Sequence, residues 1–252
     1  MIELFNIFLY QPIASILVLL YGVLPGGFGV AIIVLTILVR LILYPLSAKG
    51  IESQKALTDI QPKVKEIQDK YKDDKEKQVQ EVLNVYKEAK INPFSGFLPL
   101  LIQIPILIAL YRVLRHVQDD NFGEVLYSFV PFSGEINSMF LGIVDLGLDG
   151  LNQINGNWMA MVGAITIILG AGAAQFFQMR MATRRHETKK EKKKKQDPAM
   201  EMAEKMQKQM IYFFPVFTVV ILLKLPLAVG LYWLTTAVFS IIQQHIVFKK
   251  YE

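Results

Sequence analysis

The sequence has no cysteine among its 252 residues. This absence excludes disulfide bonds, thiol chemistry and a lipid anchor attached to a cysteine. Familiar catalytic motifs are missing as well, because no Walker loop, GxGxxG, HExxH or nucleophile elbow occurs. The three histidines, His116, His186 and His245, stand far apart in the chain. We therefore expect neither an enzyme nor a bound metal or cofactor.

Apolar residues are abundant: they make up 53% of the chain, and the mean hydropathy is +0.36. A membrane-spanning helix needs about 20 apolar residues to cross a hydrocarbon core about 30 Å thick. The sequence contains five windows that reach or approach this length. It therefore predicts an all-α integral membrane protein with five transmembrane helices, over residues 26–48, 93–116, 158–178, 209–224 and 225–248.

Basic residues are concentrated in two of the connecting segments. Of the 27 Lys and Arg residues, ten lie in residues 49–92 and eleven in residues 179–208. Residues 117–157 have no Lys or Arg and carry six acidic residues instead. Because basic loops stay in the cytoplasm, we expect the two basic segments and the tail, residues 249–252, on the cytoplasmic side. The acidic segment is expected outside.

The N-terminal segment, residues 1–25, is the ambiguous part of this topology. Its apolar stretch is interrupted by Gln11, Pro12 and Ser15, and no Lys or Arg precedes it. A signal peptide, or a span that starts in the cytoplasm, would have basic residues there. We therefore favour an extracytoplasmic helix that lies on the membrane surface and ends at the Pro-Gly-Gly turn beginning at Pro25.

Residues 49–92 are highly charged, but their apolar residues recur at helical spacing. The first stripe steps by three and four residues, as in a coiled-coil seam: Leu57, Ile60, Val64, Ile67 and Tyr71. A second stripe follows a polar turn: Val79, Val82, Tyr86 and Ala89. The pattern predicts an antiparallel helical hairpin, with a kink at Pro62 where it leaves the membrane. The seam either only holds the hairpin together or also docks a partner.

Residues 179–208 combine a like-charged run, KKEKKKK, with a cluster of methionines. The run predicts a flexible, solvated loop; attraction to anionic lipid headgroups or to RNA is the alternative. Methionine side chains adapt to many apolar partners. Met202 and Met206 are therefore candidates for docking a substrate or partner, and simple packing at the membrane edge is the other interpretation.

Polar residues inside the expected spans are few, and they share helix faces. In the first span Thr36, Arg40 and Tyr44 follow one another at intervals of four residues. The candidates on other spans are Gln103, Gln175, Gln178, Tyr232, Trp233, Thr236 and Ser240. Each residue except Arg40 also has an ordinary structural interpretation, such as bonding its own backbone or joining two helices.

Arg40 is the most informative of these residues because it lies six residues before Leu46, the expected cytoplasmic end of its span. A charge at the centre of a spanning helix costs roughly 2.5 to 3.5 kcal/mol, less if the side chain reaches the interface. A buried carboxylate would offset this cost, but none of the five expected spans contains Asp or Glu. We therefore expect the guanidinium to face water in a hydrophilic groove open to the cytoplasm.

Four segments, in order along the chain, carry a resemblance to a known family. They are TILVRLILYPLS, QPKVKEIQDKYK, INPFSGFLPLLIQIPILIALYRVL and LPLAVGLYWLTTAVFSIIQQ. The sequence resembles the YidC-type membrane protein insertases of bacteria and their mitochondrial and chloroplast relatives, from Phe28 to Val247. The resemblance implies five spans in a bacterial inner or plasma membrane, with the N-terminus outside and the C-terminus in the cytoplasm.

The resemblance also implies site residues and partners. In that family the residues at the positions of Arg40 and Thr36 line the groove, and an aromatic pair at Tyr232 and Trp233 faces it. Nascent membrane proteins would be the substrates and the Sec translocon a partner, with ribosomes or signal recognition particle machinery as further candidates. Only short segments flank the outermost helices, so we expect no large outer domain and weak ribosome tethering.

The function expected from the sequence is that of a membrane protein insertase and chaperone. A substrate's polar segment would enter the groove, with its acidic groups attracted to Arg40, while its apolar segment moves laterally into the bilayer. One alternative is a small-anion transporter with Arg40 as its binding site, although no pair of broken helices suggests inverted repeats. Another is a passive scaffold that uses only the hairpin and the methionine-rich segment. No small-molecule substrate is expected.

Overall fold

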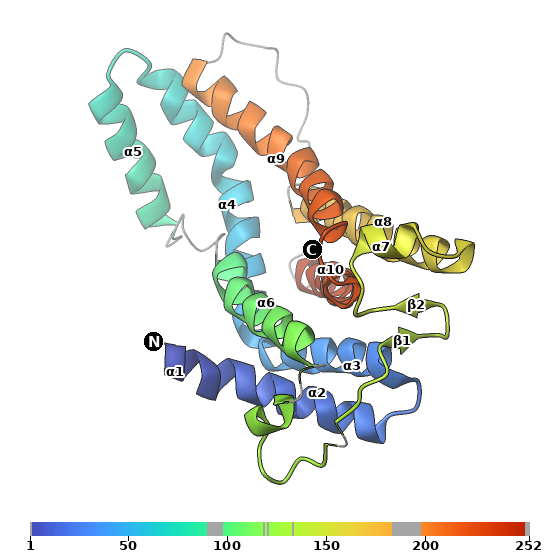
Figure 1. Ribbon diagram of the computed structural model, residues 1–252. Coiled ribbons are helices and arrows are strands. Elements are labelled where there is room, and N and C mark those ends of the chain that lie inside the picture. Colours follow the sequence, from blue (N-terminus) through green and yellow to red (C-terminus); the bar gives the residue numbers. More distant parts are fainter. Residues whose placement is uncertain are drawn as a thin grey trace.

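A computed structural model of the chain describes residues 2–89, 98–117, 119, 121–132, 134–182 and 198–249. The side chains of residues 2, 98–102, 182, 198–208 and 210 lie outside this description. The described part is mostly helical and is organised around α10, Leu227–Lys249. This helix contacts α3, α4, α6, α8 and α9, and its apolar stretch is more completely buried than that of the other long helices (Figure 1).

The described helices that are long and apolar enough to cross a membrane number three. They are Glu3–Val23, Trp158–Met181 within α8 (Trp158–Ala182), and α10. A bent pair, α3 (Gly27–Ile42) followed by α4 (Tyr44–Lys70), is a fourth if it acts as one span. The two other expected spans correspond to α6, Leu98–His116, and to the apolar part of α9, Pro198–Leu222. The fold is thus that of a helical membrane protein, and the five-span organisation stays a prediction.

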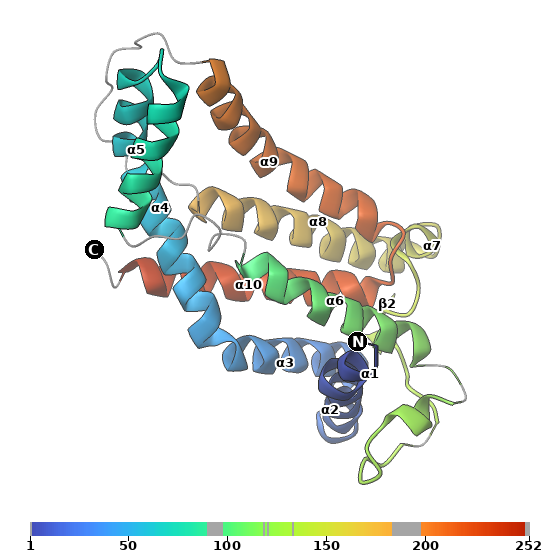
Figure 2. The same ribbon diagram turned by 90° about the vertical axis from the view of Figure 1, so that its left-hand side faces the viewer.

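The N-terminal segment forms α1 (Ile2–Phe5), a π-helical turn η1 (Asn6–Tyr10) and α2 (Gln11–Val23). Figure 2 shows α2 nearly end-on, whereas α3, α6 and α8 run across the picture, so this segment lies crosswise to the bundle. The chain then turns at Gly26, whose φ of 104° is in the left-handed region that favours glycine. The crosswise position suits a helix on the membrane surface, and the path of the segment relative to the bilayer stays a prediction.

Pro62 does not end the helix, because α4 continues through this residue, and a kink there stays a prediction. The chain bends by 68° between α3 and α4, at Leu43. Pro45 lies in the first turn of α4, where its missing N–H would have no helical partner anyway. The first expected span is therefore a helix that ends at Ile42, and α4 starts inside the range assigned to that span.

Helices α4 and α5 (Lys75–Glu88) form the antiparallel hairpin, which extends beyond the bundle together with the start of α9 (Figure 2). The Gln78 Nε2 atom donates to the Gln68 carbonyl at 2.7 Å, and Lys63 Nζ lies 3.1 Å from Glu88 Oε2. The first pair lies close to the turn and the second lies farther from it on both helices, as an antiparallel arrangement requires. Asp74 caps α5 by accepting from the Lys77 N–H at 3.0 Å.

The seam of the hairpin differs in part from the predicted one. In α4, Val64 is buried, and the other four predicted residues are half-buried: Leu57, Ile60, Ile67 and Tyr71. In α5, the buried residue is Val85, with 3% of its surface exposed, whereas the predicted Val79 is 57% exposed. Ala89 is also exposed. The predicted stripe was therefore assigned to the wrong side of α5 at Val79, whereas Ala89 lies just past the end of the helix.

Residues 117–157, here called the outer segment after their predicted location, are not a simple loop. They contain the 3₁₀ turn η3 (Phe122–Val125), strands β1 (Met139–Phe140) and β2 (Val144–Asp145), and helix α7 (Gly150–Ile154). The two strands pair antiparallel, which is a small departure from the predicted all-α fold.

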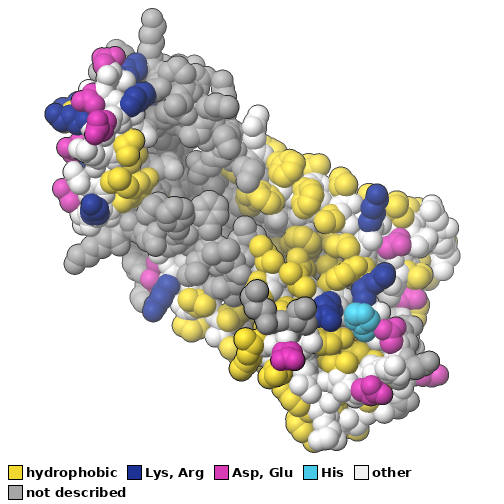
Figure 3. Space-filling model, turned by 60° about the vertical axis from the view of Figure 1, so that its left-hand side comes forward, with side chains coloured by type: hydrophobic (Ala, Val, Ile, Leu, Met, Phe, Trp, Pro, Cys, Tyr) yellow, Lys and Arg dark blue, Asp and Glu magenta, His cyan; other side chains and the backbone are white. Residues whose placement is uncertain are grey.

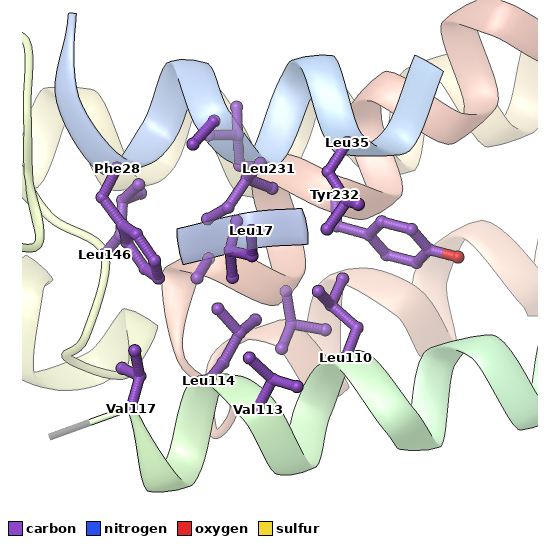
Figure 4. Close-up of a cluster of buried hydrophobic side chains, with 14 of the residues drawn as sticks. Leu17, Phe28, Leu35, Leu110, Val113, Leu114, Val117, Leu146, Leu231 and Tyr232 are labelled. Carbon is purple, nitrogen blue, oxygen red and sulfur yellow. The ribbon is translucent and has the colours of Figure 1, made fainter. Parts of the chain in front are cut away.

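The outer segment packs into the same hydrophobic core as α2, α3, α6 and α10. Leu146 lies in this core beside Phe28 of α3, and Leu17 of α2 lies near its centre (Figure 4). The Leu148 and Leu146 carbonyls accept from the backbone N–H groups of Leu227 and Ala228 at 2.9 and 3.0 Å. These first N–H groups of α10 have no partner within their own helix. The outer segment thus caps and positions the start of the central helix.

Candidate functional site

Arg40 lies in the last turn of α3, just before the bend. Its Nη2 atom donates a hydrogen bond to Gln103 Oε1 of α6 at 2.8 Å. The Nε2 atom of Gln103 in turn donates to the hydroxyl of Tyr232 on α10. Two hydrogen bonds between three side chains therefore join three helices at one point. Gln103 and Tyr232 are neutral, so the charge of Arg40 is hydrogen-bonded without being cancelled.

No acidic side chain in the described part of the chain forms an ion pair with Arg40. Arg40 is half-buried, and its guanidinium has five N–H donors. The bond to Gln103 uses one of them, so the group retains capacity for further acceptors. An arginine with one neutral protein partner can bind a carboxylate of another molecule, and Arg geometry allows that contact to be bidentate.

Polar residues continue along the same face of α10. Thr236 and Ser240 follow Tyr232 at intervals of four residues, and all three are buried. Within the described residues the Thr236 hydroxyl has no hydrogen-bond partner. One turn further, Gln243 Nε2 donates to Ser47 Oγ at 2.9 Å and to the Tyr44 carbonyl at 3.2 Å. The buried polar face therefore runs from Arg40 to the first turn of α4.

Four of the residues expected in the groove are not part of this network. Thr36 is buried, and its hydroxyl donates to the Ile32 carbonyl at 2.6 Å, so it satisfies its own helix. Gln175 Oε1 accepts from the buried Thr218 hydroxyl and thereby joins α8 to α9. Trp233 packs half-buried against the core, and Gln178 is half-buried on α8 without a hydrogen bond to Arg40. The bend at Leu43 interrupts the helix face that Tyr44 and Arg40 were expected to share. Tyr44 joins the polar network only through its backbone carbonyl, which accepts from Gln243.

Sequence reasoning missed Ser47 and Arg112. Ser47 follows Arg40 by two helical turns, and this spacing could have predicted that it shares the Arg40 face. Arg112 is a second cation within an expected span, and its Nη1 atom donates to Asn6 Oδ1 at 3.2 Å. Its guanidinium also lies 4.9 Å from the ring centroid of Tyr10. Arg112 therefore holds the N-terminal segment against α6 through a hydrogen bond and a cation–π contact.

Two parts of the expected site fall outside the described residues. The side chains of Met202 and Met206 are not described, although their backbones belong to α9. The lysine-rich run also lies outside the described residues, as do residues 90–97, which connect the hairpin to α6. The docking role of the two methionines and the groove beside Arg40 therefore stay predictions.

Comparison with known families decides where the chain belongs. The family described as 60Kd inner membrane protein matches residues 19–252. The chain belongs to this family. Together with the apolar helices, membership of the family identifies the chain as a bacterial inner membrane protein.

Relatives in the family carry the name "Membrane protein insertase YidC". The one from Beijerinckia indica is 34% identical over 96% of this chain, and the one from Caulobacter vibrioides is 32% identical over 97% of it. This chain spans 37% of the length of each of these two relatives. A relative from Fusobacterium nucleatum is closer in size: it is 31% identical, with 89% of this chain and 88% of the relative covered. The region around Arg40 lies within the matched family residues.

Proposed function

We propose that the chain is a membrane protein insertase. It receives the polar segment of a nascent membrane protein beside Arg40 and releases the apolar segment laterally into the bilayer. The observation that supports this proposal is the Arg40–Gln103–Tyr232 network, in which a half-buried cation has neutral partners on two other helices. The names of the relatives agree with it.

The positive charge provides the attraction for the substrate. An acidic group that enters the low-dielectric interior loses hydration, and the Arg40 guanidinium compensates for part of that loss. An ion pair within the protein would have cancelled this attraction, which Gln103 does not do. Burial of the substrate's apolar segment in lipid then supplies the driving force. Such a mechanism needs no nucleotide.

The apolar segment needs a path from the site into lipid. Helices α6 and α9 both contact α10 but have no extensive contact with each other among the described residues. Both present exposed apolar side chains, including Ile104 and Ile108 on α6 and Phe213 and Phe217 on α9. A substrate helix that leaves between α6 and α9 would contact these exposed apolar side chains.

The finer topology and the partners belong to the same proposal. The five spans would surround a groove open to the cytoplasm, with the hairpin and the C-terminus on that side. The substrates are nascent membrane proteins, and the Sec translocon, ribosomes or signal recognition particle machinery, and anionic lipids are proposed partners. The basic connecting segments support a cytoplasmic contact with such anionic partners.

Reconstituted insertion tests the role of Arg40. The purified chain in liposomes is given a single-span substrate with either an acidic or a neutral polar tail. We expect Arg40→Ala and Arg40→Glu to reduce insertion of the acidic substrate by about tenfold or more, as loss of one charge-assisted contact implies. Arg40→Lys should retain much of the activity, because it keeps the charge. Lys49→Ala removes an exposed cation from α4 and serves as the control.

Unchanged insertion of the acidic substrate by both Arg40→Ala and Arg40→Glu would refute the proposed attraction. The neutral-tailed substrate separates attraction from folding, because a misfolded variant inserts neither substrate. Small-anion transport and passive scaffolding have no support from the named relatives, which are insertases.

A further inference from the structure

A cavity of about 390 Å³ lies at the end of the core remote from Tyr232. Its lining includes Phe28, Val117 and Leu146, which gather at one end of the buried cluster in Figure 4, with Tyr232 at the other end. The start of α3, the end of α6, the outer segment and the α9–α10 turn line it. None of the predicted site residues lines this cavity. It is therefore separate from the proposed insertion site.

The cavity is bordered by charges of both signs. Arg115 comes from the end of α6, Asp119 follows it, and Asp145 comes from β2. His116, next to Arg115, also lines the cavity, and its Nδ1 atom lies 3.5 Å from the Tyr10 hydroxyl. Figure 3 shows basic, acidic and histidine side chains gathered beside the apolar band, at the end of the molecule away from the hairpin. The cavity thus combines an apolar floor with ionic groups at its edge.

These charges do not neutralise one another. Arg115 and Asp119 form no ion pair or side-chain hydrogen bond with any residue that the structure describes. Asp145 Oδ1 accepts from Ser138 Oγ at 2.5 Å and from the Gly147 N–H at 2.9 Å, and neither bond uses Oδ2. Opposite charges that face one cavity without pairing suit a ligand that carries both charges itself.

The position of the cavity along the helices indicates where such a ligand comes from. The apolar part of α6 ends at Leu114, directly before Arg115 and His116, and α10 begins beside the cavity at Leu227. The end of α6 therefore passes from apolar to polar side chains at the level where α10 begins. Lipid headgroups occupy this level of a bilayer.

We propose that this cavity binds the zwitterionic headgroup of a phospholipid with a phosphate and a primary ammonium. The phosphate contacts Arg115, beside His116, and the ammonium contacts Asp119 and the free oxygen of Asp145. A primary ammonium has three N–H donors for these carboxylates. A quaternary choline group has none, and a glycerol headgroup has no positive charge. The site therefore discriminates phosphatidylethanolamine from phosphatidylcholine and phosphatidylglycerol.

Native mass spectrometry of the purified full chain in detergent tests the proposal. The probes are phosphatidylethanolamine, phosphatidylcholine and phosphatidylglycerol with identical acyl chains. We expect phosphatidylethanolamine to be retained about tenfold more tightly than the other two, and Arg115→Gln and Asp119→Asn each to remove most of that preference. Both residues are exposed and lack side-chain partners among the described residues, so the fold should tolerate these variants.

Two matched variants control for a general effect of charge. Lys224→Gln and Glu124→Gln remove one exposed charge of each sign near the same end of the helices, and neither residue lines the cavity. They should leave the lipid preference unchanged. Equal retention of the three lipids, or equal behaviour of cavity variants and controls, would overturn the proposal. Binding of free phosphoethanolamine as tightly as the lipid would also overturn it, because the ligand would then be a soluble phosphate ester.

Discussion

Gln103 uses both ends of its amide in the candidate site. Its Oε1 atom accepts from Arg40 Nη2 at 2.8 Å, and its Nε2 atom donates to Tyr232. A neutral amide gives the guanidinium a hydrogen bond and leaves the net charge of the site at plus one. At the scale of the single residue, the site therefore depends on Gln103 as well as on Arg40.

Substitution of Gln103 separates charge from hydrogen bonding. In Gln103→Glu the new carboxylate pairs with Arg40, so we expect near-normal thermal stability but about tenfold less insertion of an acidic-tailed substrate. In Gln103→Leu the hydrogen bonds are lost, and the protein should be destabilised by about 1–3 kcal/mol. Insertion assays and thermal unfolding in detergent, on the same preparations, measure both effects. Wild-type insertion by Gln103→Glu would contradict the proposed attraction.

The Arg40 network was only partly predictable at this scale. Helical spacing placed Tyr232, Thr236 and Ser240 on one face, and the structure buries all three there. Gln103 and Gln175 had equal standing in the sequence, yet one bonds Arg40 and the other bonds Thr218. The difference depends on how α6 and α8 are rotated about their axes, which spacing within one helix does not specify.

At the scale of the element, the hairpin shows how a helix face is selected. Helix α5 buries Val85 in the seam and leaves Val79 exposed. Its side facing α4 also includes Gln78, whose amide bonds the Gln68 carbonyl. A hydrophobic stripe alone did not reveal that a glutamine belongs to the seam, which explains why the predicted stripe was misplaced.

The two valines of α5 offer a matched pair of substitutions. Val85→Ala removes buried methyl groups and should destabilise the hairpin by about 1–3 kcal/mol. Val79→Ala should have little effect, because its side chain is mostly exposed. Hydrogen exchange of the α5 amides, followed by mass spectrometry, reports local opening. Equal exchange in the two variants would contradict the observed seam.

At the scale of the whole molecule, the outer segment is a structural part of the core. Phe122 is buried, with 1% of its surface exposed, although the sequence predicted only an acidic connection here. The backbone N–H of Tyr127 also donates to the Ser15 hydroxyl of α2 at 3.1 Å. The segment therefore ties the N-terminal helix, the end of α6 and the start of α10 together.

Truncation of an aromatic side chain in the outer segment tests this integration. Phe122→Ala should destabilise the protein by about 3–5 kcal/mol, as expected for a buried phenylalanine. Phe129→Ala is the control, because Phe129 is 71% exposed. Thermal unfolding in detergent distinguishes the two variants. A melting temperature for Phe122→Ala that matches the control would show that the segment folds independently of the helices.

The sequence by itself determined the membrane class, the helical content, the hairpin and the candidate residues of the Arg40 face. These features depend on hydropathy, charge and spacing along one chain, which are local properties. Only the tertiary structure decided the partner of Arg40, the bend at Leu43, and the burial of the outer segment with its cavity. Each of these features depends on the rotation and tilt of helices that are distant in sequence. The spacing of residues along one helix does not specify these angles, because both surfaces in contact determine how two helices pack.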